Sequence, residues 1–427
     1  MATTTEEMKP GEIVGHLFRK ESGRLVAVLT RLFGPHNLDL AEDVVQDSFT
    51  EAINQWSYSG IPSNPAAWIF KVAKNKAINI LNREKYKRQY VSDVSHLLQS
   101  EWTAEPALQY FFSDQEILDD QLRMMFTCCH PAITTDSQVA LSLKTLCGFS
   151  IPEIAKAFLT TEENIKKRLV RARQNIREDK IPFEVPQGKE LEKRLQAVLE
   201  TVYLLFNEGY SASKGNDIIR YELCEEAIRL TEIILQHPVI QNKTNVYALL
   251  ALMQLNASRF KARQDNDGRL ITMEQQDRSL WNRELIENGI TNLSRSTSEP
   301  LSVYYILAAI SACHCTAVDY ASTNWTAILS LYDSLVVIDK SPVILLNRTV
   351  AVSKVNGAQQ ALKELEHLKN IPSLAGYYLF YSTQAEFYIQ LNDTGKAIES
   401  LERATALAPL QAEKDLLSER LSTALKK

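Results

Sequence analysis

Several features that mark other classes of protein are scarce in this chain of 427 residues. It has only 14 glycines and 14 prolines, and β-branched runs with period-two alternation are hard to find, which disfavours a β-sheet protein. No stretch approaches the roughly 18 apolar residues that a membrane span needs, and the N-terminus lacks the apolar core of a signal peptide. We therefore expect an all-α, cytoplasmic protein that has no membrane partner.

The pattern of the six cysteines disfavours a metal site. Cys128 and Cys129 are adjacent, whereas Cys313 and Cys315 flank His314. None of these forms the CxxC pair that is typical of structural zinc sites. We expect reduced and mostly buried thiols, with no metal and no cofactor.

The sequence also lacks the marks of an enzyme. Glu208 and His314 have the side chains of an acid and a base, but no nucleophile–base arrangement or carboxylate pair surrounds them. No glycine-rich loop that binds phosphate is present either. We expect a binding protein and no catalytic residue.

Charge is distributed unevenly along a chain whose net charge is −5. Seven basic residues fall within 66–88, and seven more fall within 166–180. Two basic helices in an acidic chain favour two separate surfaces that contact phosphates. The alternative is that each basic stretch is simply a solvated helix face.

Breaks in periodicity divide the chain into three helical regions. Residues 91–113 lack strong periodicity, and residues 181–189 contain two prolines and a glycine. The predicted domains are 11–90, 114–180 and 190–427, with linkers at 91–113 and 181–189.

The first motif is an amphipathic helix within 37–56. We predict that Asp39 caps it and that Glu42 completes a capping box. Its apolar stripe consists of Ala41, Val44, Val45, Phe49 and Ala52. The opposite, acidic face consists of Glu42, Asp43, Gln46 and Asp47. Taken by itself, such a face could be solvent coating.

The second motif is a basic helix within 63–88. Ser63 or Asn64 is expected to cap it, and Pro65 suits its first position. One face collects basic and amide side chains, namely Lys71, Lys74, Asn75, Asn82 and Lys85. Such a face suits phosphates and exposed base edges. Trp68 is assigned to the buried side, although base stacking is an alternative.

The third motif, within 149–178, has the pattern of a helix-turn-helix. Ser150 and Glu153 form a capping box, and Thr161 caps the second helix after the turn. Burial of Ile165, Leu169 and Ala172 leaves four polar residues able to face a DNA major groove. These four are Asn164, Lys167, Arg168 and Arg171.

Together, these three motifs resemble the extracytoplasmic-function (ECF) sigma factors of the sigma-70 family. The match covers roughly residues 11–179, and the short linker leaves no room for the middle domain of a housekeeping sigma factor. The resemblance implies two small helical sigma domains, which bind RNA polymerase core and promoter DNA. The turn has Leu159 where a glycine is often seen, which affects the pose of the second helix.

The resemblance also assigns roles to individual residues. The acidic helix looks like region 2.2, which docks on the polymerase, so Glu42, Asp43, Gln46 and Asp47 would bind polymerase. The basic helix looks like regions 2.3 and 2.4, so Lys71, Lys74, Asn75, Asn79 and Arg83 would bind the −10 element. The helix-turn-helix looks like region 4.2, so Asn164, Lys167, Arg168 and Arg171 would read the −35 element.

The C-terminal part resembles a narrower group, the sigma factors with a fused tetratricopeptide-like extension. Three strings carry this resemblance: MMFTCCHPAI (124–133), YLLFNEGYSAS (203–213) and QDRSLWNRELI (276–286). The resemblance implies that the extension regulates the sigma factor. FNEGY at 206–210 is interpreted either as a helix C-cap closed by Gly209 or as a regulatory contact.

The clearest repeat is the last one. Tyr381, Ala385, Tyr388, Ala397, Leu401, Ala404 and Pro409 match a 34-residue tetratricopeptide unit. Stacks of such units expose a concave surface, so we expect a protein or peptide ligand of the extension.

Two hypotheses about function remain at this stage. The first is a sigma factor that directs RNA polymerase to promoters and carries its own regulatory extension. The alternative is a helix-turn-helix regulator on a tetratricopeptide scaffold that does not bind polymerase as a sigma subunit. The acidic helix favours the first hypothesis, because a simple repressor has no use for a polymerase-docking face.

Overall fold

The computed structural model describes residues 10–87, 111–158, 160–210, 219–265, 267–297 and 301–425. Within these ranges the regular elements are helices, and a single isolated β-bridge joins Gln264 to Leu270. The all-α prediction is therefore confirmed. The chain divides into two compact units, Met1–Leu205 and Phe206–Lys427. The three predicted domains and their limits remain a prediction.

Unit 1 opens with three long helices. They are α1 (Pro10–Phe33), α2 (Leu38–Ser59) and α3 (Pro65–Lys87), and a short 3-10 helix η1 (Pro35–Asn37) precedes α2. Asn64 caps α3, since its Oδ1 accepts a hydrogen bond from the Ala67 N–H at 3.0 Å. Gly34 and Gly60 end the preceding helices in the left-handed region, with φ of 83° and 79°.

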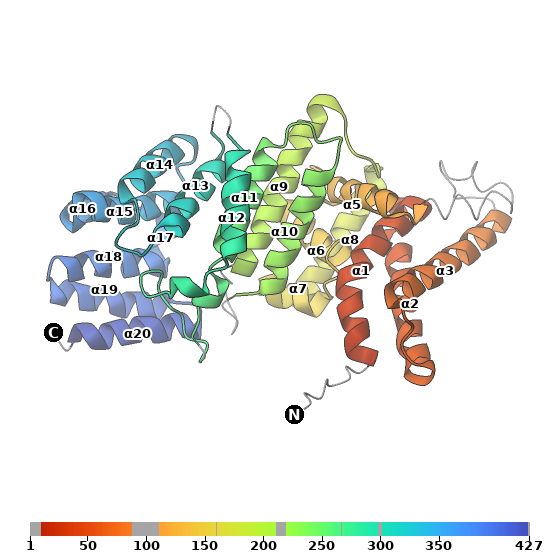
Figure 1. Cartoon of the computed structure of the whole chain (residues 1–427), viewed down its shortest axis with the longest axis horizontal. Coiled ribbons are helices and arrows are strands. Elements are labelled where there is room, and N and C mark those ends of the chain that lie inside the picture. The colour runs from red at the N-terminus through yellow and green to blue at the C-terminus, as the bar shows by residue number, and fades with distance from the viewer. Residues whose placement is uncertain are drawn as a thin grey trace. The chain divides into compact units, whose positions relative to one another are not determined.

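Five further helices follow in the chain (Figure 1). They are α5 (Asp114–Cys128), α6 (Thr135–Thr145), α7 (Ile151–Phe158), α8 (Glu162–Glu178) and α9 (Gly188–Tyr210). Most of the predicted linker 91–113 lies outside the described residues, as does Leu159 of the turn. Residues 181–187, with their two prolines, form no helix.

The predicted apolar stripes form the core of unit 1. All five stripe residues of α2 are buried, from Ala41 to Ala52, together with Trp56. Ile165, Leu169 and Ala172 of α8 are buried in the same way. Burial of one face forces the polar residues of each helix onto the other face, and these are the residues that matter for function.

Unit 2 continues as a succession of helices (Figure 1). They are α10 (Tyr221–Gln236), α11 (Thr244–Ala257), α12 (Arg283–Ser294), α13 (Val303–Thr316), α14 (Trp325–Ile338), α15 (Pro342–Asn356), α16 (Ala358–Leu368), α17 (Pro372–Ala375), α18 (Tyr378–Gln390), α19 (Thr394–Leu407) and α20 (Gln411–Leu425). Between α11 and α12 the chain forms two 3-10 helices, η2 (Phe260–Ala262) and η3 (Arg278–Leu280).

The last predicted repeat coincides with the helix pair α18 and α19. Tyr381, Ala385, Ala397, Leu401 and Ala404 are buried, whereas Tyr388 is partly exposed. Small alanines at these positions let the two helices approach closely, as in a tetratricopeptide unit. The buried pattern is that of a helical repeat, and its tetratricopeptide identity stays a prediction.

Two local predictions about helix ends are wrong. Asp39 lies within the first turn of α2 and does not cap it, because η1 leads directly into the helix and puts Asn37 at the N-cap. Gly209 does not close α9, which continues to Tyr210. No helix within the described ranges is long and apolar enough to cross a membrane.

Candidate functional site

The acidic face of α2 is where the amphipathic pattern predicts it. Asp43, Gln46 and Asp47 are exposed on this helix, because Val44, Val45 and their neighbours turn inward. Glu42 lies at the edge of the face and is only partly exposed. Three of the four predicted polymerase-binding residues thus lie on one open surface.

Glu42 is held by an arginine that is 131 residues away in the chain. Arg173 of α8 donates from Nη2 to Glu42 Oε2 at 2.7 Å, and its Nε lies 2.8 Å from Asp39 Oδ1. Arg177 lies 3.9 Å from the other oxygen of Asp39. We call this set, Asp39, Glu42 and Arg173, the clasp.

Two of the three clasp side chains are largely withdrawn from solvent, whereas Asp39 is 54% exposed. The side chains of Arg173 and Glu42 are 14% and 16% exposed. Burial raises the pKa of Glu42, and the nearby charges of Arg173 and Lys144 oppose that rise. The arginine is therefore the counter-charge of a partly desolvated carboxylate, and removal of either partner would leave the other poorly compensated.

The basic face of α3 is largely open. Lys71, Asn75, Asn79 and Arg83 are exposed, whereas Lys74 is partly buried. Trp68 is partly exposed and packs edge-on against Trp56 of α2, with ring centroids 5.4 Å apart, so its assignment to the buried side stays a prediction. The exposed amides and cations could contact phosphates and unpaired bases together.

Both predicted caps of the helix-turn-helix are present. The Ser150 N–H donates to Glu153 Oε2 at 2.7 Å, and the Glu153 N–H donates to Ser150 Oγ at 3.4 Å. Thr161 caps α8 by accepting from the Asn164 N–H at 3.2 Å. These bonds satisfy donors at the first turns of α7 and α8, which holds the two helices at a defined start.

The second helix of this motif presents most of the predicted DNA-reading residues to solvent. Asn164, Lys167 and Arg171 are exposed on α8. Arg168 is partly buried, and its Nη2 lies 3.0 Å from Asp136 Oδ2 at the start of α6. The position of Arg168 fits a recognition helix, but the arginine is held by an acidic residue in this conformation.

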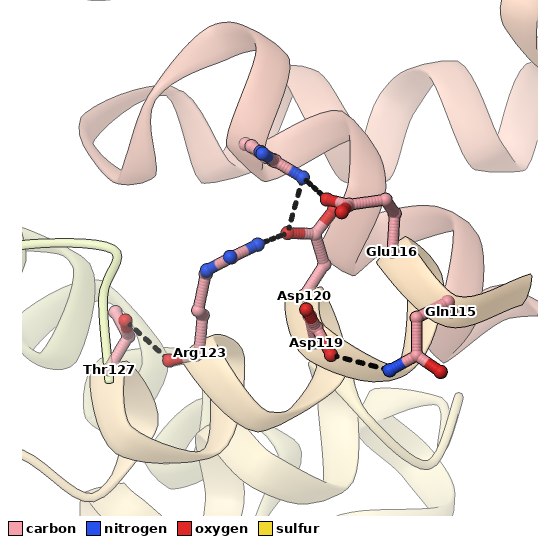
Figure 2. Close-up of polar contacts among 7 residues, drawn as sticks. Gln115, Glu116, Asp119, Asp120, Arg123 and Thr127 are labelled. Atoms are coloured by element: carbon pink, nitrogen blue, oxygen red, sulfur yellow. Dashed lines mark hydrogen bonds and ion pairs between the residues drawn. The ribbon is translucent and has the colours of Figure 1, made fainter. Parts of the chain in front are cut away.

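Unit 1 is joined through a buried charge network between α1 and α5. Arg31 of α1 pairs with Glu116 and lies 3.5 Å from Asp120, which also pairs with Arg123. Figure 2 shows Glu116, Asp120 and Arg123 turned toward this cluster from α5. Burial raises the pKa of Asp120 to about 7, although both arginines oppose the rise. Asp120 Oδ1 faces the guanidinium groups of both Arg31 and Arg123. Asp120 Oδ2 has no hydrogen-bond partner among the described residues.

Two more arginines of α1 connect it to the same part of the chain. Arg19 pairs with Glu153 of the helix-turn-helix and stacks over the Phe149 ring at 4.1 Å. Arg24 lies 2.9 Å from Asp114 at the start of α5. The two predicted sigma regions therefore contact each other through at least three groups of ion pairs.

The described residues offer no place for a metal. No group of three His, Cys, Asp or Glu side chains within them could hold an ion. Four of the six free cysteines are buried, and burial raises the pKa of the Cys128, Cys129 and Cys224 thiols. A thiol with a raised pKa is a poor nucleophile and a poor ligand at neutral pH.

Comparison with protein families matches three parts of the chain. A model of sigma-70 region 2 matches residues 17–89, and a model of sigma-70 region 4 matches residues 123–176. Residues 194–297 match a family of unknown function, DUF6596. The acidic helix and the basic helix thus fall in region 2, and the helix-turn-helix falls in region 4.

Similar proteins come from several bacteria. "Uncharacterized protein R00370" of Rhizobium meliloti is 35% identical over 384 residues, which cover 90% of this chain and 89% of that protein. The ECF RNA polymerase sigma-E factors of Escherichia coli K12 and Salmonella typhimurium LT2 are each 27% identical over 135 residues. Those matches cover 31% of this chain and 70% of each relative. No solved structure gives a significant match.

Proposed function

The chain belongs to the sigma-70 family and shares nearly its whole length with the rhizobial protein R00370, and we propose that it is an ECF-type sigma factor with a fused regulatory extension. It binds RNA polymerase core and directs it to specific promoters. The observation that carries this proposal is the exposed row of Asp43, Gln46 and Asp47 on α2. A DNA-binding regulator that never docks on polymerase would not need this row.

Docking relies on charge and geometry at α2. The row lies on a helix whose other face is anchored in the core, so its carboxylates are presented on a rigid support. Complementary charges across an interface accelerate encounter and fix the orientation of the partners. We assign Asp43, Gln46 and Asp47 to contacts made directly, and Glu42 to a contact made only after the clasp opens.

Promoter recognition is divided between two helices. Lys71, Asn75, Asn79 and Arg83 of α3 bind the melted −10 element, together with Lys74. Asn164, Lys167 and Arg171 of α8 read the −35 duplex in the major groove. Because phosphate contacts release counterions, promoter affinity should fall steeply as salt rises.

The described conformation is not yet ready for both tasks. Glu42 is engaged in an ion pair with Arg173, and Arg168 is engaged in an ion pair with Asp136. We infer that the two sigma regions separate before the protein engages polymerase and DNA. The ion pairs of α1 with Glu153 of the helix-turn-helix and with Asp114 of α5 are among the contacts that this separation must break.

Unit 2 is assigned the regulatory role. Its helices build a repeat-like array, and the matches to the sigma-E factors cover only 31% of this chain. A stacked helical array provides a broad surface for a protein or peptide. We propose that such a ligand acts through unit 2 on the sigma regions.

Charge reversal on α2 tests this function. The double variant Asp43→Lys and Asp47→Lys should abolish co-elution with RNA polymerase core and promoter-dependent transcription. The matched control is Glu399→Lys with Glu402→Lys on α19, which makes the same change in net charge at two exposed residues. Normal polymerase binding by the α2 variant would favour the alternative, a DNA-binding regulator that is not a polymerase subunit.

A further inference from the structure

Two strings that stand out in the sequence meet in unit 2. Tyr210 ends the string FNEGY, and Trp281 ends the string QDRSLW. Arg259 connects them, because its Nη2 donates to the Tyr210 hydroxyl at 2.6 Å and its guanidinium lies 5.8 Å from the Trp281 ring centroid. The Asn282 N–H donates to the Ser258 carbonyl at 2.8 Å, which fixes this arrangement through the backbone.

Three arginines gather at this junction. Arg263 lies over the Tyr210 ring at 4.0 Å, and Arg278 lies over the Trp281 ring at 4.6 Å. Arg259 lies between them, within 6.0 Å of both ring centroids. We call these three arginines and two rings the arginine cluster.

Among the described residues, the hydrogen-bond partners of the arginine cluster are neutral. Arg259 donates to the Tyr210 hydroxyl and to Asn256 Oδ1, at 2.6 and 2.9 Å. Arg263 donates to the Tyr210 carbonyl, and Arg278 donates to two backbone carbonyls at 2.6 and 2.8 Å. Within the described part of the chain, no ion pair joins any of the three to a carboxylate.

This absence is unusual for buried charge. Arg259 is only 7% exposed, and charged groups at that depth are normally paired with an opposite charge. Elsewhere in unit 2, Arg220 pairs with Glu208 at 2.7 Å and Arg348 pairs with Asp333 at 2.7 Å. Among the described residues, the arginine cluster has no counter-charge, whereas these other arginines of unit 2 have one.

Three residues of the cluster carry unsatisfied donors, and Gln276 Oε1 and His314 Nδ1 are also buried without a hydrogen-bond partner among the described residues. Arg259 Nε, Arg278 Nη2 and Trp281 Nε1 are buried and have no hydrogen-bond partner among the described residues. Arginine and tryptophan nitrogens donate and never accept, so only an acceptor can satisfy them. Buried polar groups without a partner in a native structure call for an ion, a ligand or a water.

Three described titratable groups near the cluster, His314, Cys315 and Asp319, do not supply the missing charge. Burial, together with Arg259 and Arg278, lowers the pKa of His314 to about 4, so this imidazole is neutral at pH 7. Burial likewise raises the pKa of Cys315. The charge of Asp319 acts on the pKa of Arg278 without forming an ion pair with it. Asp319 is exposed and accepts a hydrogen bond from the Ser322 N–H at 2.7 Å.

We propose that the arginine cluster of unit 2 is a binding site for an oxyanion, a phosphate or carboxylate group of a small ligand. The guanidinium groups provide charge and forked donors, which suit both groups. Tyr210, Arg263 and Arg278 are only partly buried, which leaves the cluster a route to solvent. This site is independent of the proposed polymerase function, because it rests on unit 2 alone.

The test uses the full-length protein and two simple anions. Thermal unfolding is followed in sodium phosphate and in sodium acetate, each against sodium chloride at equal ionic strength. A bound anion should raise the unfolding temperature by several degrees and in a saturable manner. A shift in phosphate alone assigns a phosphate ligand, and a shift in acetate assigns a carboxylate ligand.

Variants separate the site from general salt effects. Arg278→Gln should lose the saturable shift, whereas Arg295→Gln should keep it, because Arg295 is exposed over Tyr247 outside the cluster. Trp281→Phe keeps an aromatic ring and loses only the Nε1 donor, so it replaces Arg278→Gln if that variant does not fold. It should raise the anion concentration at half-saturation at least threefold. An equal shift in every variant, or no saturable shift in the wild type, would overturn the proposal and leave an ordered water as the partner of these donors.

Discussion

Gly209 lies inside α9, at the point where α10 approaches it. A Cβ atom there would lie 2.7 Å from Cys224 Sγ, 2.8 Å from Leu223 Cβ and 2.9 Å from the Arg220 carbonyl oxygen. These distances are shorter than van der Waals contact. Packing therefore requires a glycine at this position, which explains the glycine of the FNEGY string.

Gly209→Ala should destabilise unit 2 by about 1–3 kcal/mol, as overpacking of a close contact does. The helix propensity of alanine opposes this loss by about 1 kcal/mol. The matched control is Gly395→Ala in the first turn of α19, where a Cβ meets nothing within 4 Å. Chemical denaturation of both variants measures the difference, and equal stabilities would contradict the packing argument.

Asp120 makes the stability of unit 1 depend on pH. Its pKa is raised from 3.8 to about 7 by burial, so the folded state holds a proton that the unfolded state releases at lower pH. Its contribution to stability is present below about pH 4 and is lost as the pH rises toward 7. Asp120→Asn should flatten the measured stability across that window. Asp119→Asn changes the neighbouring carboxylate, which accepts from Gln115, and is the control (Figure 2).

Arg171 should act on a base edge. Its replacement by alanine is expected to weaken binding to the −35 duplex by about 1–3 kcal/mol, with little effect on a scrambled duplex. Competition binding at fixed salt measures both affinities. Equal losses of affinity for both duplexes would indicate that Arg171 contacts a phosphate. No loss of affinity for either duplex would show that Arg171 does not contact DNA.

At the scale of elements, the local sequence pattern predicts most of the helices that position the candidate site. The stripe of α2, the Asn64 cap of α3 and both caps of the helix-turn-helix are properties of residues within a few positions of each other. Such short-range rules give a helix, its start and its buried face. The exposed faces then follow, because they are what burial leaves.

Contacts between distant elements could not be predicted in this way. Arg173 belongs to the second basic stretch, but nothing near it in the sequence indicates that it reaches Glu42. The position of Asp39 in the sequence predicts a helix cap, but its carboxylate instead makes a tertiary contact with Arg173. The arginine cluster is similar, since Tyr210, Arg259 and Trp281 lie in three separate segments.

Arg173→Ala tests whether the clasp competes with polymerase. It removes a buried hydrogen bond to a charged group, which costs the closed arrangement about 1.5–3 kcal/mol. The open form should then be more populated, and the apparent affinity for polymerase core should rise at least about threefold. Arg177→Ala is the control, because its side chain is half-exposed and lies 3.9 Å from Asp39. Unchanged affinity in both variants would mean that the clasp does not limit docking.

The whole molecule combines two sigma regions with an extension that carries its own candidate binding site. In unit 1, ion pairs of Arg19, Arg24, Arg31 and Arg173 hold the sigma regions together. In unit 2, we propose an oxyanion ligand for the arginine cluster and a protein or peptide ligand for the helical repeats. Under these proposals, one chain contains both the sigma regions that the ion pairs hold together and the extension that binds a ligand.

Co-elution of the full-length chain with RNA polymerase core tests the central claim most directly. The measurement compares the wild type with Arg173→Ala, both checked for folding by circular dichroism. We predict that both proteins co-elute with polymerase, and that Arg173→Ala does so to a greater extent than the wild type. Failure of both folded proteins to co-elute would contradict the assignment of this chain as a polymerase subunit.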